Sequence, residues 1–153
     1  MAPKDIPRTL EAGPPAYALE AQVGHLLRRA HQRHAAIFLD GIGAASLTPM
    51  QWAALVTLVR GGRATQNHLG RLTAMDPATI QGVVRRLRAR GLIAGAPDPS
   101  DRRAMLLTPT AAGIALVEAT LPAAVAISDA TLAPLDPAER RTFLQLLQRM
   151  AFA

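Results

Sequence analysis

The 153-residue sequence contains no cysteine, which excludes disulfide bonds, thiolate metal sites and thiol-based redox sensing. It also lacks an uninterrupted apolar run of the ~18 residues that a membrane span needs, although half of its residues are apolar. The N-terminal residues lack the basic-then-apolar layout of a secretory signal. A cytoplasmic protein without membrane partners is therefore expected.

Lysine is almost absent as well, because Lys4 is the only lysine among 17 basic residues. The chain is long enough for about one domain with its own core. Because all the other basic residues are arginines, the net charge of +6 is carried by arginine, whose planar guanidinium suits phosphates and base edges. The charge favours a polyanionic partner, but an ordinary basic surface explains it equally well. The positions of the arginines must decide.

Apolar spacing and capping residues predict six helices. Residues 1–15 contain four prolines and little periodicity, which predicts a flexible arm. Spacings of three and four predict a first helix over residues 16–40, stopped by Gly41 and Gly43. Caps and apolar stripes predict five more helices: Thr48–Gly61, Thr65–Leu72, Asp76–Gly91, one that begins at Thr110 and one that begins at Asp136.

The helix from Asp76 to Gly91 has two contrasting faces. Ile80, Val83, Val84 and Leu87 form an apolar face that is predicted to pack inward. The opposite side carries small and hydrogen-bonding residues: Ala78, Thr79, Gln81, Gly82, Arg85 and Arg86. Arginine can bind guanine and glutamine can bind adenine in the major groove. A solvated helix is the alternative, but glycine costs a helix about 1 kcal/mol, and close approach of a partner would explain it.

A short helix, the Thr73–Met75 turn and this longer helix have the arrangement of a helix-turn-helix, whose second helix reads DNA. Apolar runs at 92–94 and 104–107, separated by turn residues, predict a hairpin that forms a wing. Six arginines lie in this stretch, at 85, 86, 88, 90, 102 and 103, against only Asp98 and Asp101. The basic charge is therefore local to one helix and its neighbouring hairpin.

Three segments between Leu47 and Gly113 resemble the MarR family of bacterial transcriptional regulators: LTPMQWAALVTL, TQNHLGRLTAMDPATIQGVVRRLRARGLI and DPSDRRAMLLTPTAAG. The Asp-Arg wing followed by Thr-x-x-Gly is the most specific part. The resemblance implies a mainly α fold, α+β in the wing. A winged helix-turn-helix DNA-binding domain would occupy 47–108, with dimerisation helices at 16–46 and 109–153. Pro109 stands where the family usually has Leu, and its missing amide puts the register of the second wing strand in question.

The resemblance further implies a homodimer on double-stranded DNA with a pseudo-palindromic operator. In each subunit the recognition helix would enter the major groove and the wing the minor groove. Arg102 would be the minor-groove arginine, Asp101 its orienting carboxylate and Arg103 a phosphate contact, since a narrow minor groove attracts arginine. The residues predicted to contact DNA are Thr65, Gln66, Asn67, Ala78, Thr79, Gln81, Gly82, Arg85, Arg86, Asp101, Arg102 and Arg103.

Many members of that family are repressors released by small aromatic acids or related compounds, bound between the dimerisation helices and the winged domain. A carboxylate site needs a cation and an apolar wall, and the candidates here are Arg29, His34, Phe38, Met50 and Trp52. Structural roles compete with this assignment. Trp52 also fits a hydrophobic staple over the Thr48 cap, and His34 a satisfied core histidine.

Catalytic motifs such as HExxH, a P-loop or Gly-x-Ser-x-Gly are absent. His31 and His34 lie three apart on a helix, but no third metal ligand follows at useful spacing. No enzyme activity, cofactor or metal is therefore expected. The sequence predicts a ligand-responsive transcriptional regulator, a repressor in the first instance, and does not separate repressor from activator. A ligand-independent, nucleic-acid-binding architectural protein is the alternative.

Overall fold

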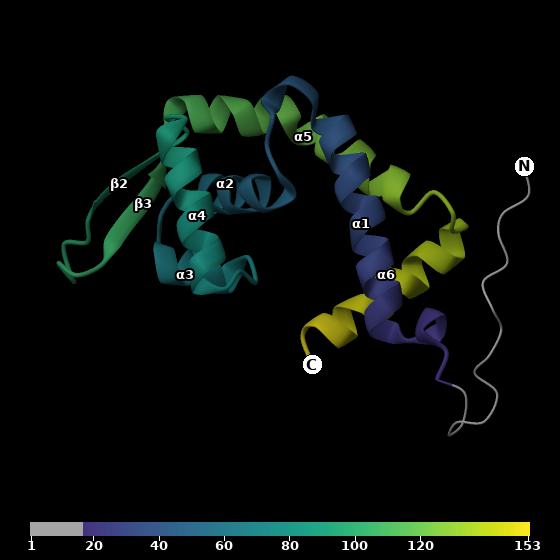
Figure 1. The fold of residues 1–153 in the computed structure, drawn as a ribbon. Coiled ribbons are helices and arrows are strands. Elements are labelled where there is room, and N and C mark those ends of the chain that lie inside the picture. The colour runs from purple at the N-terminus through teal and green to yellow at the C-terminus, as the bar shows by residue number, and fades with distance from the viewer. Residues whose placement is uncertain (1–16) are drawn as a thin grey trace, which may run out of the picture. The chain divides into compact units, whose positions relative to one another are not determined.

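The computed structural model describes residues 17–153 as a mainly helical chain with one small antiparallel sheet (Figure 1), which confirms the predicted fold class. The arm predicted for residues 1–15 lies outside the described residues. The elements are η1 (Leu19–Ala21), α1 (Val23–Ile42), η2 (Gly43–Ala45), α2 (Pro49–Gly61), β1 (Ala64–Thr65), α3 (Gln66–Leu72), α4 (Pro77–Ala89), β2 (Ile93–Pro97), β3 (Met105–Pro109), α5 (Ala111–Thr131) and α6 (Pro137–Ala151). Residues up to Gln32 belong to one compact unit and Arg33–Ala153 to another, so α1 contributes to both.

The described part of the first unit contains η1 and the first half of α1. Gln22 has an extended backbone with ψ 135°, so α1 begins at Val23 and not at residue 16 as predicted. The apolar side chains of this segment are exposed, from 44% for Leu27 to 75% for Tyr17. The apolar spacing therefore marks a surface that this unit does not bury by itself.

α1 continues through Gly41, where the sequence predicted that it would stop. A Cβ atom on Gly41 would lie 2.7 Å from Cγ1 of Ile127, so glycine is needed here for α1 to approach α5. The regular helix ends at Ile42, and Gly43 adopts a left-handed φ of 56°. The prediction was wrong because glycine at a helix end can serve either as a terminator or as a contact point.

Side-chain caps fix the starts of α2 and α4 as predicted. The Thr48 hydroxyl accepts a hydrogen bond from the amide of Gln51, and the Gln51 side chain accepts one from the amide of Thr48. Asp76 accepts from the amide of Thr79 at 2.9 Å and caps α4. Ala74, with a left-handed φ of 53°, makes the turn between α3 and α4. These local bonds establish the helix-turn-helix.

One hydrophobic core joins α2, α3, α4 and the sheet. The predicted apolar face of α4 is buried, because Ile80, Val83, Val84 and Leu87 each expose 4% or less of their surface. They belong to the same core as the fully buried Leu55, Leu58, Leu69 and Leu107. Burial of this face holds α4 in place and leaves its opposite face in solvent.

The predicted hairpin is present, and the sheet contains one strand more than predicted. β2 and β3 pair antiparallel, with Ile93 opposite Pro109, and β1 pairs on the other side of β3. The amide of Thr110 donates to the carbonyl of Leu92, so Ile93 and Pro109 form a non-hydrogen-bonded pair. Proline lacks an amide hydrogen, but at position 109 that hydrogen would point away from β2 and beyond the end of β1. Pro109 therefore removes no hydrogen bond of the sheet, and the register of β3 is kept.

The last two helices also begin at their predicted caps, Thr110 for α5 and a capping box of Asp136 and Glu139 for α6. By length and composition alone, α5 is the single helix in the described part that would cross a membrane, but Val117 and Ile127 belong to the core. α6 buries no residue. Four of its large apolar residues are 41–57% exposed, and Leu147 is half-buried: the four are Phe143, Leu144, Leu146 and Met150.

Gly113, in the first turn of α5, packs closely against the backbone of Leu92. A methyl group on Gly113 would overlap the carbonyl oxygen of Leu92, which is backbone and cannot rotate away. Gly61, the last residue of α2, has nothing within 4 Å of the corresponding position.

We expect Gly113→Ala to lower the free energy of unfolding by about 1–3 kcal/mol or more, because the added methyl group overpacks the junction. The matched variant Gly61→Ala should be neutral or stabilising by up to about 1 kcal/mol. Urea unfolding followed by circular dichroism measures both. Equal stability of Gly113→Ala and the parent would contradict the contact.

Candidate nucleic-acid interface

The outer face of α4 carries the side chains predicted to read DNA. Gln81, Arg85 and Arg86 are exposed, while the opposite face forms the core. Ala78 and Thr79 lie in the first turn, directly after the Asp76 cap. This face is therefore both accessible and held in a fixed orientation.

The cap at the start of α4 limits what Thr79 can do. Its hydroxyl donates to Oδ2 of Asp76 at 2.6 Å, in addition to the backbone bond to Oδ1. These bonds, the hydroxyl bond first, lower the pKa of Asp76 below its ordinary value of 3.8. The carboxylate is thus held ionised at neutral pH. While this bond persists, the Thr79 hydroxyl offers an external partner only its lone pairs.

Gly82 lies under the side chain of Arg86. A Cβ atom at Gly82 would lie 3.5 Å from Nη2 of Arg86, which is ordinary van der Waals contact with a flexible side chain. The fold itself therefore tolerates alanine at this position. Arg86 lies one turn after Gly82 in α4, and its guanidinium extends back over that glycine.

The wing tip is held by short-range bonds of its own backbone and side chains. The amide of Asp98 donates to the carbonyl of Ala104 at 2.9 Å and closes the loop between β2 and β3. Oδ1 of Asp98 accepts from the hydroxyl and the amide of Ser100, which lower the pKa of Asp98. Arg102 and Arg103 are exposed at the tip of this closed loop.

Asp101 does not form an ion pair with Arg102 in the described chain. Its Oδ1 instead accepts from the backbone amide of Arg103 at 3.0 Å, and its carbonyl accepts from the amide of Ala104. In the chain without DNA this carboxylate supports the turn. Its predicted role in orienting Arg102 stays a prediction for the DNA-bound state.

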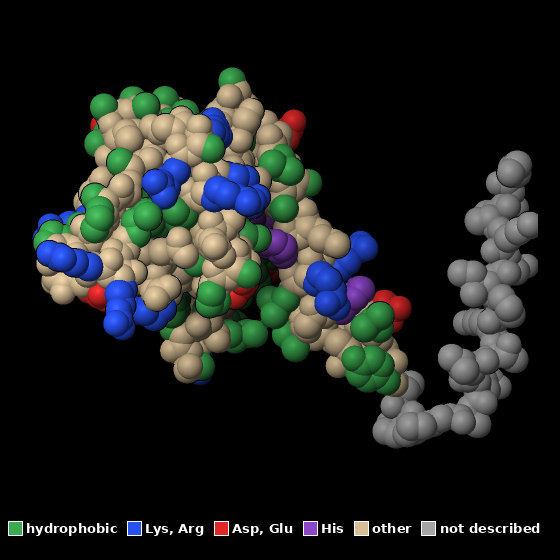
Figure 2. Space-filling view, turned by 60° about the vertical axis from the view of Figure 1, so that its left-hand side comes forward, with side chains coloured by type: hydrophobic (Ala, Val, Ile, Leu, Met, Phe, Trp, Pro, Cys, Tyr) green, Lys and Arg blue, Asp and Glu red, His purple; other side chains and the backbone are tan. Residues whose placement is uncertain are grey.

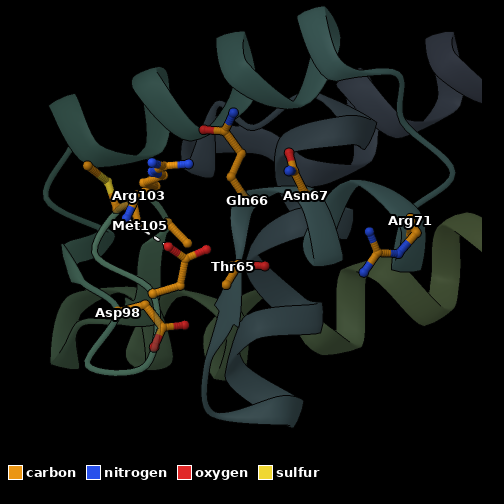
Figure 3. Close-up of a pocket in the computed structure, with 9 residues that line it drawn as sticks. Thr65, Gln66, Asn67, Arg71, Asp98, Arg103 and Met105 are labelled. Carbon is orange, nitrogen blue, oxygen red and sulfur yellow. Dashed lines mark hydrogen bonds between the residues drawn. The ribbon is translucent and has the colours of Figure 1, made fainter.

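A cavity of about 480 Å³ separates the wing from the start of α3. Figure 3 shows Asp98, Arg103 and Met105 of the wing on one side and Gln66 and Asn67 of α3 facing them. The structure thus brings Thr65–Asn67 together with Asp101 and Arg103, all of them predicted DNA contacts, while Arg102 does not line this cavity. It adds Arg71, Asp98 and Met105, which sequence analysis did not assign to the site.

Arg88 joins the recognition helix to the wing. Its Nη1 donates to Sδ of Met105 at 3.3 Å, and its guanidinium lies next to Gly95 of β2. A Cβ at Gly95 would lie 2.7 Å from the same sulfur. No local pattern identifies this contact, because it requires the wing to fold back along α4.

Arginine dominates the surface around these elements. Lys and Arg side chains, blue in Figure 2, stand out on the face that carries the winged domain. The exposed arginines of α4 and the wing are Arg85, Arg86, Arg88, Arg90, Arg102 and Arg103. A face with this charge attracts a polyanion such as duplex DNA.

The candidates for an effector site are only partly brought together. Phe38 is buried and its ring centroid lies 6.2 Å from that of His34. Nδ1 of His34 lies 3.0 Å from the hydroxyl oxygen of Thr131. The hydroxyl oxygen of Thr131 also lies 2.8 Å from the carbonyl oxygen of Ile127, one turn earlier in α5.

Trp52 reaches α5 at a different point. Its Nε1 donates to the hydroxyl of Thr120 at 3.2 Å, and Thr120 lies about 16 Å along α5 from Thr131. Met50 is 46% exposed, and Arg29 belongs to the first compact unit. The described residues contain no cluster of three or more His, Cys, Asp or Glu side chains that could hold a metal.

Comparisons with known proteins agree with this geometry. Residues 45–104 match the model of the MarR family. Over 150 residues the chain is 41% identical to the HTH-type transcriptional repressor NicR of Pseudomonas putida. This match covers 98% of this chain and 95% of NicR.

Two solved structures are similar over nearly their whole length. A probable transcriptional regulator from Pseudomonas aeruginosa is 53% identical, with 87% of this chain and 99% of that chain covered and a TM-score of 0.83. BpsR of Bordetella bronchiseptica, whose DNA binding is regulated by 6-hydroxynicotinic acid, is 45% identical, with 90% and 99% covered and a TM-score of 0.84.

These relatives are transcriptional regulators, which confirms the prediction of a DNA-binding regulator that is not an enzyme. The sequence resemblance, the winged helix-turn-helix and the full-length relatives lead to one conclusion. The chain belongs to the MarR family of transcriptional regulators.

Proposed function

We propose that this chain acts in the cytoplasm as a homodimeric repressor, and that a small aromatic carboxylic acid releases it from a pseudo-palindromic operator. The observation that carries the proposal is the position of α4, which buries one face in the core and presents Gln81 and Arg85 on the other. Beside it, the closed wing loop exposes Arg102 and Arg103. A major-groove reader and a minor-groove reader thus share one rigid domain.

Exposed apolar residues on the terminal helices support the homodimer. α6 has no buried residue, and Phe143, Leu144, Leu146 and Met150 are all exposed. Leu121 and Val125 of α5 are 48% and 60% exposed. Monomeric soluble proteins rarely leave so many large apolar side chains in solvent, so a second copy is the occupant we propose for these faces.

The similarity to BpsR supports a pyridine carboxylic acid as the effector, with 6-hydroxynicotinic acid as the first compound to test. We place its site where α1 and α2 meet α5, near His34, Phe38 and Trp52. Because the contacts of Trp52 and His34 on α5 are about 16 Å apart, a single-ring acid contacts one end of this set and not both. A protonated His34 would supply the charge for the carboxylate.

The mechanism we propose is a shift between two dimer conformations. One holds the two recognition helices about one DNA turn apart, ~34 Å, and binds the operator. The acid binds the other conformation more tightly, and the operator is released in proportion to that difference in affinity.

Titration of the acid against an operator complex tests this function. DNA from upstream of the chain's own gene serves as the operator, and unrelated DNA of equal length serves as the control. We expect 6-hydroxynicotinic acid to lower operator affinity and to change the fluorescence of Trp52, the single tryptophan of the chain. Tighter binding to the operator than to unrelated DNA at moderate salt separates a regulator from an architectural protein. Fluorescence change without release would contradict the regulatory role of the acid.

Arg102→Ala should weaken operator binding by about tenfold or more, because the minor groove loses an inserted cation worth about 1–3 kcal/mol. Fluorescence anisotropy with labelled operator measures the affinity. The control is Arg141→Ala on α6, which removes the same charge from an exposed position outside the proposed DNA interface. Both variants should keep the thermal midpoint and the dimer mass. Equal operator affinities of Arg102→Ala and the parent would remove Arg102 from the interface.

Gly82→Ala should raise the free energy of unfolding by up to about 1 kcal/mol and at the same time weaken operator binding. The fold accommodates the methyl group, so a loss of affinity would come from the DNA side. Gly61→Ala on α2 is the control for a helical glycine outside the interface. If Gly82→Ala is stabilised and binds the operator as tightly as the parent, DNA does not approach this position closely.

A further inference from the structure

Arg90, the residue that ends the recognition helix, reaches across to the connection between α1 and α2. Its Nη2 donates to the carbonyl of Ala45 at 2.8 Å and its Nη1 to the carbonyl of Ser46 at 3.1 Å. The fork of one guanidinium therefore holds two successive carbonyls. Such charge-assisted pairs are stronger and more directional than neutral hydrogen bonds.

The two carbonyls belong to the point where α1 stops. η2 follows α1 directly and ends at Ala45, and Ser46 turns the chain in a left-handed conformation, φ 48° and ψ 41°. Carbonyls at a helix end lack intrahelical partners and carry the negative end of the helix dipole. Arg90 thus supplies, from α4, the cation that the end of α1 and η2 favours.

The same end of α4 is attached to α5 by contacts of a different kind. The hydroxyl of Thr110 donates to the carbonyl of Gly91 at 2.7 Å, and its amide donates to Leu92. Gly113 packs its backbone on Leu92 with no room for a side chain. These short contacts hold the end of α4 directly against the start of α5, whereas Arg90 is a long side chain with several rotatable bonds.

We propose that Arg90 is a positioning residue that sets how α4, together with the core of α2, α3 and the sheet that holds it, tilts about its contacts with Thr110 and Gly113, and that it links this tilt to the state of α1. The proposal rests on the proposed function, in which an effector shifts the dimerisation helices. α4 is about 20 Å long, so a rotation of about 10° at its anchored end moves the operator-reading end by roughly 3 Å. That displacement is comparable to the length of one hydrogen bond to a base edge.

Distance measurement by electron spin resonance tests the tilt directly, without DNA or effector. The chain has no cysteine, so labels attach only at introduced cysteines. One pair joins Ala36→Cys on α1 to Ala78→Cys at the start of α4, and a second pair joins Ala36→Cys to Ala89→Cys at its end. All three positions are exposed. Dilution with unlabelled chain restricts the signal to distances within one subunit.

We expect Arg90→Gln to broaden the 36–78 distance distribution clearly and the 36–89 distribution much less. Arg90→Lys, which keeps the charge, should give an intermediate width. Arg88→Gln loses the same charge two residues earlier but contacts Met105 and not α1, so its 36–78 distribution should match the parent. A folded Arg90→Gln variant with the parental 36–78 width would overturn the proposal.

The second arm measures operator affinity with and without 6-hydroxynicotinic acid. Arg90→Gln should bring the ratio of the two affinities at least about fivefold closer to one, the lower end of the usual range of coupling between sites. Arg88→Gln should lower both affinities and keep their ratio. An unchanged ratio for Arg90→Gln, despite a broadened distribution, would overturn the link to the effector. If the parent itself ignores the acid, the proposed effector fails, and the distance measurement alone decides the role of Arg90.

Discussion

The backbone contact between Gly113 and Leu92 is the constraint on which the rest of the winged domain depends. Three elements meet there: α4 has just ended, β2 is about to begin, and α5 is in its first turn. The N-cap of α5, Thr110, donates hydrogen bonds to the carbonyls of Gly91 and Leu92, just after the end of α4. The end of the recognition helix is therefore held directly against the start of the long helix α5, in addition to the chain connection through the β2–β3 hairpin.

α4 separates folding from recognition on its two faces. Ile80, Val83 and Leu87 hold the helix in the core, and the Asp76 cap fixes where it begins. The exposed face contributes little to stability, since surface substitutions away from such features usually change it by less than about 0.5 kcal/mol. In the proposed function, side chains such as Gln81 and Arg85 can therefore vary to suit base edges with little effect on the fold. This separation suits a family whose members recognise different operators on one scaffold.

Local chemistry was predictable from the sequence, and long-range contact was not. The caps at Thr48, Asp76 and Asp136 were found because each acts within three residues of itself. β1 escaped detection because two residues have no periodicity. The sequence analysis counted Arg90 only as one arginine of the basic stretch, because its hydrogen-bond partners lie 44 and 45 residues away in the chain. The residues of an effector site were the hardest to predict from the sequence, because a pocket depends on how the helices are placed relative to one another and not on their sequence alone.

The wing illustrates how preorganisation and mobility divide between backbone and side chains. Bonds from Asp98 to Ser100 and from Asp101 to Arg103 fix the loop before any DNA is present. Arg102, exposed and without an ion pair to Asp101, keeps its rotamer freedom in the described chain. Entry into a groove would cost roughly 2 kcal/mol of side-chain entropy. A groove narrow enough to concentrate negative potential offsets that cost, so in the proposed role Arg102 would discriminate by DNA shape and not by base identity.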